Sequence, residues 1–380
     1  VFLSSGQAPK AGERFRAPDL AKTLMEFGRF GAEYIYKGTF AERFYRLSDE
    51  AGESGSTFSG GEFDRFYRQP PVFYTPLSID YRGNTIYQTA PVSQGFLMLE
   101  QMKIIENFDL PSLEPGSSEV IHLMAEAKKL AFRDRNLYAG DPLFSGFNAH
   151  EFISAGHGQR LASVIDSAKV ISKAELGPGG VGPENQGDTA SFVAVDCEGN
   201  ACSFIHSNAF SFGSGVVVPG TGVILNNRAG RSFVLEKDHP NCVSPGKKPM
   251  HTLNCYMVFA DGDFFIAGGT PGGDGQPQWN MQMLSLMLDH GYGPQEACDF
   301  PRWLSFPGTD VLHLDRSLEL RVESGVLPET VLSLTKLGHT VRTIRPWAGG
   351  GGAQIIMLDP DSGLLMGGSD RRLEGLALGF

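Results

Sequence analysis

Residues 177–213 read GPGGVGPENQGDTASFVAVDCEGNACSFIHSNAFSFG, and they separate two parts of the chain that differ in character. Up to Asp188 the stretch is rich in Gly and Pro, a composition that excludes regular secondary structure. From Thr189 onward the residues follow a strand–turn–strand pattern around Glu198-Gly199-Asn200. A hydroxyl residue therefore stands where irregular chain becomes strand.

The position of Thr189 suggests that the chain cuts itself there and that Thr189 becomes a catalytic N-terminus. A Thr hydroxyl is a weak nucleophile unless a base removes its proton, and the freed α-amine of the same residue can be that base. Such an amine has an unperturbed pKa of about 7.7–8.0, so it exchanges protons near neutral pH. The alternative is that Thr189 simply begins a strand.

Composition limits the classes of protein and partner. The chain has 380 residues, 41% of them hydrophobic and 20% charged, as in soluble globular proteins. Its net charge of -11 opposes binding to nucleic acid or to anionic lipid. No apolar run approaches the roughly 20 residues of a membrane helix, and the start, VFLSSGQAPKAGERF, lacks the pattern of a signal peptide. We expect a cytoplasmic protein, although a signal upstream of this sequence would not be visible in it.

The cysteines and histidines give no indication of a metal site or cofactor. The five cysteines are odd in number and include no CxxC pair, so we expect buried free thiols at Cys197, Cys202, Cys242, Cys255 and Cys298. The histidines are scattered, and no HExxH spacing is present. We therefore predict that the chain uses neither a metal nor a cofactor.

The first part of the chain is mainly helical by periodicity and capping residues. Two helices are predicted over 17–46, broken near Gly31 and Gly38, and a loop over 51–61. A hairpin is predicted over 72–89, followed by helices over 95–108, 118–138 (capped by Ser117 or Ser118) and 152–171.

The second part contains short β-rich runs separated by Gly, Asn and Asp turns. Besides 191–196 and 201–206, strands are predicted over 216–218, 221–225, 254–259, 264–268, 353–358 and 364–367. Helices are predicted over 278–290, 294–300 and 327–337. Strands with segregated helices indicate an α+β protein, and sheets packed face to face with helices outside would suit this pattern.

Five motifs, in order, strongly resemble the small subunit of the γ-glutamyltransferase family: GDTASFVAVDCEGNACSFIHSNAFSFGSG, GVILNNRAGRSF, PGKKPMHTLNCYMV, GGTPGGDGQPQWNMQMLSLMLDHGYGPQEACDFPRW and GGAQIIMLDPDSGLLMGGSDRRLEGLALGF. The motifs GERFRAPDLAKTL, GAEYIYKG, YRGNTIYQTAPVSQG and AKKLAFRDRNLY resemble the later part of that family's large subunit. The resemblance covers nearly the whole chain.

The resemblance implies an N-terminal-nucleophile hydrolase with a four-layer αββα sandwich. Residues 1–188 would be the later part of the large subunit, and residues 189–380 the small subunit. The precursor would cleave itself between Asp188 and Thr189, and a homodimer of the processed heterodimer is a possible assembly. The early part of the family's large subunit, which supplies strands and an arginine for the substrate, has no counterpart in this sequence.

The resemblance also assigns the catalytic residues. Thr189 would be the nucleophile, first in cleavage and then in acyl transfer, and Ser207 would hydrogen-bond the Thr amine. Gly272 and Gly273 would supply the backbone amides of the oxyanion hole, since glycines let N–H groups approach a developing negative charge closely. Outside this context the glycine pair would be interpreted as a plain turn.

One departure from the family pattern affects the amine-binding position. The transferases hold the substrate's α-amine with an acidic residue after a pair of asparagines, but Asn226-Asn227 is followed here by Arg228 and Arg231. Arg231 stands at the expected position of the acid. An arginine would repel an ammonium group and could bind a carboxylate with two hydrogen bonds. The alternative is that the arginines form structural ion pairs.

Two further positions of the acyl pocket differ. The family's serine pair is replaced by His251-Thr252. An expected asparagine aligns with Ala209, and Asn208 could replace it, although a shift by one residue along a strand reverses the direction of the side chain. His251 could bind substrate or form a hydrogen bond in the core.

These differences favour the acylase and amidohydrolase members of the family, which act on small-molecule amides. We predict a self-processing amidohydrolase or acylase whose substrate carries a carboxylate on its acyl group. One alternative is a γ-glutamyl hydrolase or transferase that acts on glutathione-like donors. Another is an inactive relative that serves as a binding or scaffold protein.

Overall fold

The computed structural model describes residues 3, 6–51, 58, 60–69, 72–176, 189–307 and 317–380. The Gly/Pro-rich segment before Thr189, with Asp188, lies outside these residues, as does most of the loop predicted over 51–61. The chain forms two compact units, Val1–Thr75 with Phe212–Asn226, and Pro76–Ser211 with Asn227–Phe380. These units reflect packing, so the predicted subunit boundary at Thr189 stays a prediction.

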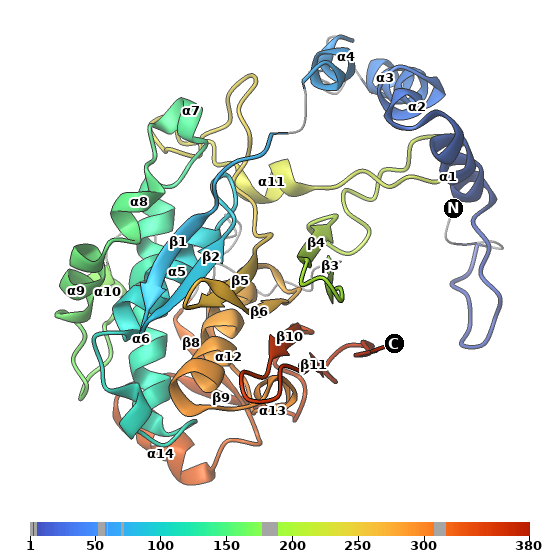
Figure 1. The fold of residues 1–380 in the computed structure, drawn as a ribbon. Helices are drawn as coiled ribbons and strands as arrows, with labels where there is room; N and C mark the ends of the chain where they lie inside the picture. The colour runs from blue at the N-terminus through green and yellow to red at the C-terminus, as the bar shows by residue number, and fades with distance from the viewer. Residues whose placement is uncertain are drawn as a thin grey trace. The chain divides into compact units, whose positions relative to one another are not determined.

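The first unit is helical (Figure 1), with α1 (Pro18–Phe30), α2 (Ala32–Tyr36), α3 (Thr39–Glu50) and α4 (Glu62–Tyr67). The breaks expected near Gly31 and Gly38 are confirmed, but the two breaks separate three helices, whereas two were predicted. Phe40 and Phe44 of α3 form a small core with Val218. The strands predicted over 216–218 and 221–225 are wrong, because this segment turns tightly at positive φ and forms a single bridge between Val217 and Ile224.

The second unit is organised around a six-stranded antiparallel sheet with the order β1-β2-β5-β6-β10-β11. Its strands are β1 (Leu77–Tyr81), β2 (Asn84–Gln88), β5 (Cys255–Ala260), β6 (Asp263–Gly269), β10 (Gln354–Leu358) and β11 (Leu365–Ser369). Each strand agrees with the prediction from sequence to within a few residues. The hairpin predicted over 72–89 begins later, at Leu77.

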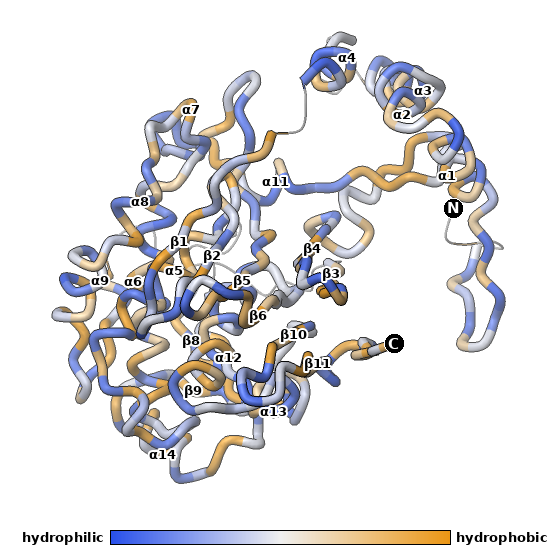
Figure 2. The backbone as a smooth tube through the Cα atoms, viewed as in Figure 1, coloured by the Kyte–Doolittle hydropathy of each residue, from blue (hydrophilic) through white to orange (hydrophobic). Residues whose placement is uncertain are grey.

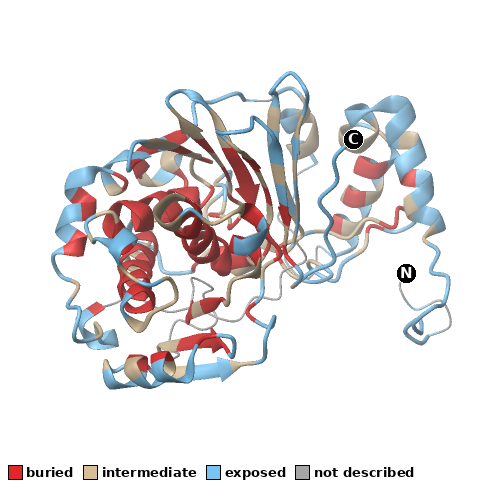
Figure 3. Ribbon diagram, turned by 60° about the horizontal axis from the view of Figure 1, so that its bottom comes forward, coloured by how far each residue is buried: buried red, intermediate tan, exposed pale blue. Residues whose placement is uncertain are grey.

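The core of this unit is made by this sheet and by buried helices that lie to one side of it (Figure 3). The long helices are α5 (Gly95–Ile105), α6 (Ser118–Tyr138) and α12 (Gln276–His290). Helix α6 has the predicted bounds, and its cap is Ser117, whose Oγ accepts from the amide of Val120 at 3.3 Å. Nearly every residue of α5 and α12 is buried, so both helices are covered on all sides.

The single helix predicted over 152–171 is wrong. The structure has α8 (Ala149–Phe152) and α9 (Ala155–Ala162), and then α10 (Lys173–Leu176). Helix α9 begins after Ser154, whose Oγ accepts from the amide of His157 at 3.3 Å. It ends at Ala162, well before the predicted end at residue 171, and a turn with a bridge between Asp166 and Lys169 follows. Short polar side chains favour helix starts over helix interiors, and the apolar pattern alone did not reveal this one.

The remaining strands form two small sheets. Strands β3 (Thr189–Val195) and β4 (Ala201–Ser207) form the expected hairpin. A three-stranded sheet of β7 (Trp303–Phe306), β8 (Glu319–Glu323) and β9 (Val341–Ile344) was not predicted. The other short helices are η2 (Leu110–Ser112), α7 (Pro142–Ser145), α11 (Arg228–Ser232), η3 (Gly273–Gly275), α13 (Pro294–Asp299) and α14 (Pro328–Lys336). Helices combined with mainly antiparallel sheets, in which only β8 and β9 pair parallel among the described strands, confirm the α+β expectation.

The expectation that the five free thiols are buried is wrong for four of them. All five cysteines are free, but Cys298 alone is buried, whereas Cys197 and Cys202 are exposed.

Residues 373–380 are largely apolar (Figure 2), and Leu376, Leu378 and Phe380 are exposed. None of the described helices is long and apolar enough to cross a membrane.

A buried polar cluster lies where α5, α6 and α9 meet. His157 Nε2 lies 3.1 Å from Glu100 Oε1 and 2.9 Å from Asp134 Oδ2. The second carboxyl oxygen of Glu100 has no hydrogen-bond partner among the described residues. Burial raises the pKa of Glu100 from 4.5 to about 8. The folded protein therefore holds Glu100 protonated at neutral pH.

Glu100→Gln is expected to flatten the dependence of stability on pH. Between pH 4.5 and about 8 the folded state retains a proton that the unfolded state releases. The free energy of unfolding therefore falls as pH rises through this window, by up to about 1.4 kcal/mol per pH unit. Glutamine does not titrate, so the variant should gain stability relative to wild type as pH rises. Urea denaturation at several pH values measures this, and parallel curves for both proteins would contradict it.

Candidate active site

The β3–β4 hairpin positions Thr189. Asp196 fixes its turn, because Asp196 Oδ1 accepts from the amides of Glu198 and Asn200, each at 2.9 Å. The resulting register pairs Thr189 with Ser207, the first residue of β3 with the last of β4. Ser203 Oγ donates to the carbonyl oxygen of Gly268 at 2.9 Å and so attaches the hairpin to β6.

Thr189 and Ser207 lie in direct contact. Their hydroxyl oxygens are 2.8 Å apart, and Ser207 Oγ also accepts from the amide of Ala209 at 2.9 Å. The resemblance assigned Ser207 to the Thr amine, whereas the structure places the Ser207 hydroxyl against the Thr189 hydroxyl. Asp188, the other residue of the predicted cleavage site, lies outside the described residues.

The two glycines assigned to the oxyanion hole lie just after the end of β6. Gly272 has φ +124° and Gly273 has φ +54°, conformations that L side chains rarely adopt. A Cβ at Gly272 would overlap Cζ3 of the Trp279 indole on α12. The backbone amide of Gly275 donates to the carbonyl oxygen of Gly272 at 2.9 Å. This hydrogen bond closes the glycine loop, residues 272–275. Glycine is therefore required here by both conformation and space.

Arg228, His251 and Thr252 form a group, and Arg231 stacks on an aromatic ring. Arg228 Nη2 donates to Thr252 Oγ1 at 2.9 Å, and its Nη1 to Ser232 Oγ at 3.1 Å. Burial, with the nearby charges of Arg228 and Arg135, lowers the pKa of His251 to about 4, so His251 is neutral at pH 7. The Arg231 guanidinium lies 3.8 Å from the centre of the Phe210 ring, a cation–π contact.

Backbone contacts connect these groups. The amide of Asn227 donates to the carbonyl oxygen of Asn208 at 3.2 Å, which joins the end of the hairpin to α11. Gln94 Nε2 lies 3.4 Å from the carbonyl oxygen of Thr252 and 3.2 Å from that of Gly273. Arg228 therefore connects through Thr252 and Gln94 to the glycine loop.

Gln94 and Trp279 contact the proposed oxyanion-hole glycines, and the sequence did not predict a role for either residue. Gln94 stands in the motif YRGNTIYQTAPVSQG. Its backbone N–H donates to the carbonyl oxygen of His251 at 2.9 Å. Trp279 stands six residues after Gly273 in another of the motifs. Their presence in the family-like segments was the available signal, but the contacts that give them roles are long-range.

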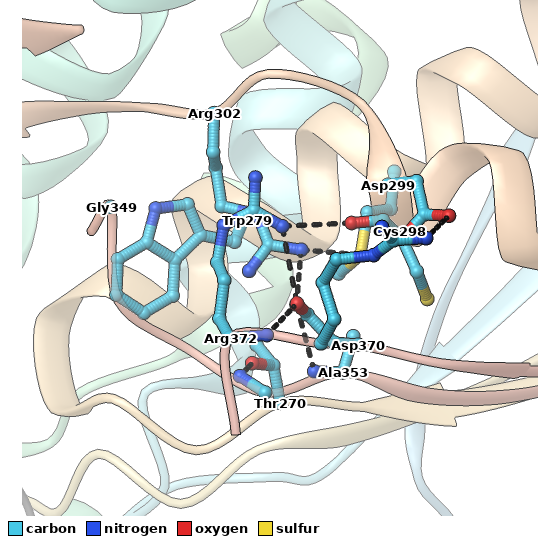
Figure 4. A network of polar contacts seen from close by, with 12 residues as sticks. Thr270, Trp279, Cys298, Asp299, Arg302, Gly349, Ala353, Asp370 and Arg372 are labelled. Atoms are coloured by element: carbon cyan, nitrogen blue, oxygen red, sulfur yellow. Dashed lines mark hydrogen bonds and ion pairs between the residues drawn. The ribbon is translucent and has the colours of Figure 1, made fainter. Parts of the chain in front are cut away.

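Buried ion pairs of Arg302, Asp370 and Arg372 form a network beside Trp279 (Figure 4). Arg302 Nη2 pairs with Asp370 Oδ2 at 2.6 Å, and Arg372 Nη2 with Glu323 Oε2 at 2.6 Å. Burial opposes the ionisation of Asp370, but the two guanidinium groups outweigh it and hold its pKa below the usual range.

The glycine run, residues 349–352, connects this network to Thr270 and Trp279, which adjoin the glycine loop. Arg302 Nη1 donates to the carbonyl oxygen of Gly350 at 3.0 Å, and the amide of Gly352 donates to Thr270 Oγ1 at 2.9 Å. A Cβ at Gly350 or at Gly351 would lie within 3 Å of the Trp279 ring. The glycine run therefore packs against the same indole that contacts Gly272.

Comparison with known proteins decides the family. The chain matches the family model described as Gamma-glutamyltranspeptidase over residues 1–380. It belongs to this family. The resemblance inferred from the motifs is thus confirmed.

Relatives within the family include hydrolases and acylases. The chain is 34% identical to a glutathione hydrolase-like proenzyme of Bacillus subtilis, over 100% of this chain and 69% of the relative. It is 32% identical to the oxamate amidohydrolase proenzyme of Klebsiella pneumoniae, over 100% of this chain and 68% of the relative. The cephalosporin acylase from Bacillus halodurans has a similar structure, with a TM-score of 0.85 at 30% identity, over 99% of this chain and 65% of that one.

Proposed function

We propose that this chain contains the nucleophile of a self-processing amidohydrolase or acylase. The observation that carries the proposal is the place of Thr189 at the first residue of β3, with its hydroxyl 2.8 Å from Ser207. The proenzyme and acylase names of its relatives support it. Cleavage between Asp188 and Thr189 would free the α-amine of Thr189, as the N-terminal-nucleophile mechanism requires.

The reaction follows from these groups. Thr189 Oγ attacks the amide carbon while the α-amine takes its proton, and the tetrahedral oxyanion forms. The backbone amides of Gly272 and Gly273 donate to that oxyanion. The intermediate collapses, the protonated amine product leaves, and an acyl ester remains on Thr189. Water then attacks the ester by the same route and releases the acid. Ser207 holds the hydroxyl in position.

The acyl group that suits the site carries a carboxylate. Arg228 is placed beside His251 and Thr252, and Arg231 follows on α11. His251 is neutral, so it can donate a hydrogen bond without adding charge. Guanidinium groups bind carboxylates well and repel the ammonium group of a γ-glutamyl donor. The main competing function is γ-glutamyl hydrolysis. The similarity to a glutathione hydrolase-like relative is the reason to test it.

The assembly proposed with this function is the four-layer αββα sandwich, cut into large and small subunits from one precursor. A homodimer of the cut form and a cytoplasmic location are part of the same proposal. Intact-mass measurement of the purified protein tests processing. Two fragments that meet at Thr189 support it, whereas a single uncut mass after prolonged incubation supports the inactive-relative alternative.

Three anilides separate the substrate classes, because they differ by one group each: glutaryl, γ-glutamyl and butyryl anilide. Glutaryl lacks the α-amine of γ-glutamyl, and butyryl also lacks the carboxylate. We expect kcat/KM for glutaryl anilide to exceed both others by at least about tenfold, the value of one charged hydrogen bond. Comparable or faster turnover of the γ-glutamyl compound would favour the competing function.

Replacement of Arg231 tests whether this side chain binds the carboxylate of the acyl group. Arg231→Gln should lower kcat/KM for glutaryl anilide by about 10- to 100-fold and leave butyryl anilide nearly unchanged. Arg231→Asp places the family's acid at this position and should raise the ratio of γ-glutamyl to glutaryl turnover. If neither variant changes the order of the three substrates, Arg231 has a structural role.

A further inference from the structure

Two imidazoles and a carboxylate meet between α6 and the turn that precedes β9. His122 and Glu126 are four residues apart on α6, so they share one face of the helix. His339 lies between α14 and β9. All three are buried, with exposed fractions of 0%, 0% and 6%. Their donor atoms lie within 4.8 Å of one another.

Hydrogen bonds to the backbone orient two of these groups. His122 Nε2 lies 2.8 Å from the carbonyl oxygen of Asp166, so this nitrogen carries the proton. The lone pair of His122 then lies on Nδ1, which faces His339 Nε2 at 2.8 Å. Glu126 Oε2 accepts from the amide of Ile171 at 2.8 Å, and Glu126 Oε1 lies 3.8 Å from His339 Nε2.

We propose that His122 Nδ1, His339 Nε2 and Glu126 Oε1 bind a divalent transition-metal ion, with Zn²⁺ the best match. Imidazole nitrogen with carboxylate oxygen is a donor set that Zn²⁺ prefers. The Asp166 carbonyl also supplies what metal-binding histidines usually have, an acceptor for the other ring N–H that fixes tautomer and orientation. This inference is independent of the proposed amidohydrolase activity.

The spacing of the donors suits an ion of this size after a small adjustment. Tetrahedral Zn²⁺ with bonds of about 2.0–2.1 Å places neighbouring donors about 3.3 Å apart. The two separations observed, 2.8 Å and 3.8 Å, lie on either side of that value. Without the ion, the proton on His339 Nε2 occupies the space towards His122. Binding requires the other neutral tautomer of His339, in which the proton lies on Nδ1 and the lone pair on Nε2.

A cavity lies on one side of His339. It has a volume of ≈ 280 Å³ and is lined by His339, Lys129, Ser305 and Glu319, among others. The three side chains leave one position of a four-coordinate ion open, and in zinc sites with three protein ligands a water molecule takes that position.

One neighbouring charge opposes the ion. Lys129 Nζ lies 2.6 Å from Glu126 Oε1 and is nearly buried. Its ammonium group competes for the carboxylate and repels a cation. Removal of this charge should therefore strengthen binding, a result that a nonspecific surface site would not give. The ligand His339 stands 217 residues from His122, so no local spacing in the sequence could have revealed the cluster.

The test titrates ZnCl₂ into chelator-treated protein by calorimetry, with Co²⁺ and its visible absorption as a reporter of tetrahedral nitrogen and oxygen ligands. Wild type should bind one equivalent. His339→Gln and Glu126→Gln should weaken binding by at least about tenfold, and Lys129→Met should strengthen it by about tenfold. His157→Gln tests the other buried group that could hold a metal ion, Glu100 with Asp134 and His157, and should leave the binding unchanged.

Three results would overturn the proposal. One is the absence of saturable binding by both wild type and Lys129→Met. Another is loss of binding in His157→Gln with retention in His339→Gln. The third is binding of several equivalents that no variant alters. Circular dichroism reports whether each variant folds, and if His339→Gln does not, the opposite effects of Glu126→Gln and Lys129→Met decide the question.

Discussion

Thr189→Ala is expected to leave the chain uncut and to abolish amide hydrolysis. The substitution removes the hydroxyl of the proposed nucleophile together with one methyl group, and the backbone of β3 can keep its register with β4. Loss of a nucleophile typically costs about 10⁴- to 10⁶-fold in turnover. Intact-mass spectrometry reports the cleavage, and release of the aniline from glutaryl anilide reports the activity.

Two matched variants show whether the hydroxyl itself is responsible. Thr189→Ser retains a hydroxyl, so we expect processing and hydrolysis to continue at reduced rates. Ser207→Ala removes the contact at 2.8 Å and should reduce both rates less severely than Thr189→Ala. If Thr189→Ala still splits before residue 189 and still hydrolyses the anilide, another residue is the nucleophile and the mechanism is wrong.

Gly272→Ala is expected to have the second largest effect. At φ +124° an alanine is strained by about 1–3 kcal/mol, and its Cβ would overlap the Trp279 indole. The loop must move, and the backbone amides at Gly272 and Gly273 move with it. Removal of one oxyanion donor costs about 10²- to 10³-fold in kcat, so turnover should fall by at least that factor. Steady-state kinetics on glutaryl anilide measures it.

Gly262→Ala separates strain from loss of the oxyanion hole. Gly262 lies in the turn between β5 and β6 at φ +92°, and a Cβ added there would meet no described atom within 4 Å. This control should lose stability and keep its activity. Gly272→Ala combined with Trp279→Phe removes the overlapping ring atoms, so part of the activity should return. Equal activity of Gly272→Ala and wild type would exclude this loop as the oxyanion hole.

The regular elements of the second unit could be predicted because their signals are local. Apolar alternation around short turns located β5, β6, β10 and β11, and propensity with the Ser117 cap located α6. The errors arose where a local signal was weak or contradicted the pattern. Helix α9 began only after the Ser154 cap and ended at Ala162, and the glycines near Val217 replaced two strands by a single bridge.

The candidate site shows the same division. The family resemblance identified Thr189, Ser207, Gly272 and Gly273, because their motifs are contiguous in the chain. It gave no role to Gln94, which contacts Gly273 across 179 residues, or to the Arg302–Asp370 pair behind Trp279. Such contacts depend on how strands and helices pack, and single-sequence periodicity carries no information about that packing.

The sequence by itself determined the family, the class of fold and the position of Thr189, the proposed nucleophile, at the start of a strand. These depend on local turn chemistry, apolar periodicity and ordered motifs. Only the tertiary structure decided that Thr189 lies beside Ser207, that Trp279 restricts Gly272 to glycine, and that His122, Glu126 and His339 meet. The physical reason is that hydrogen bonds and steric overlap act over a few ångströms in space, whatever the separation along the chain.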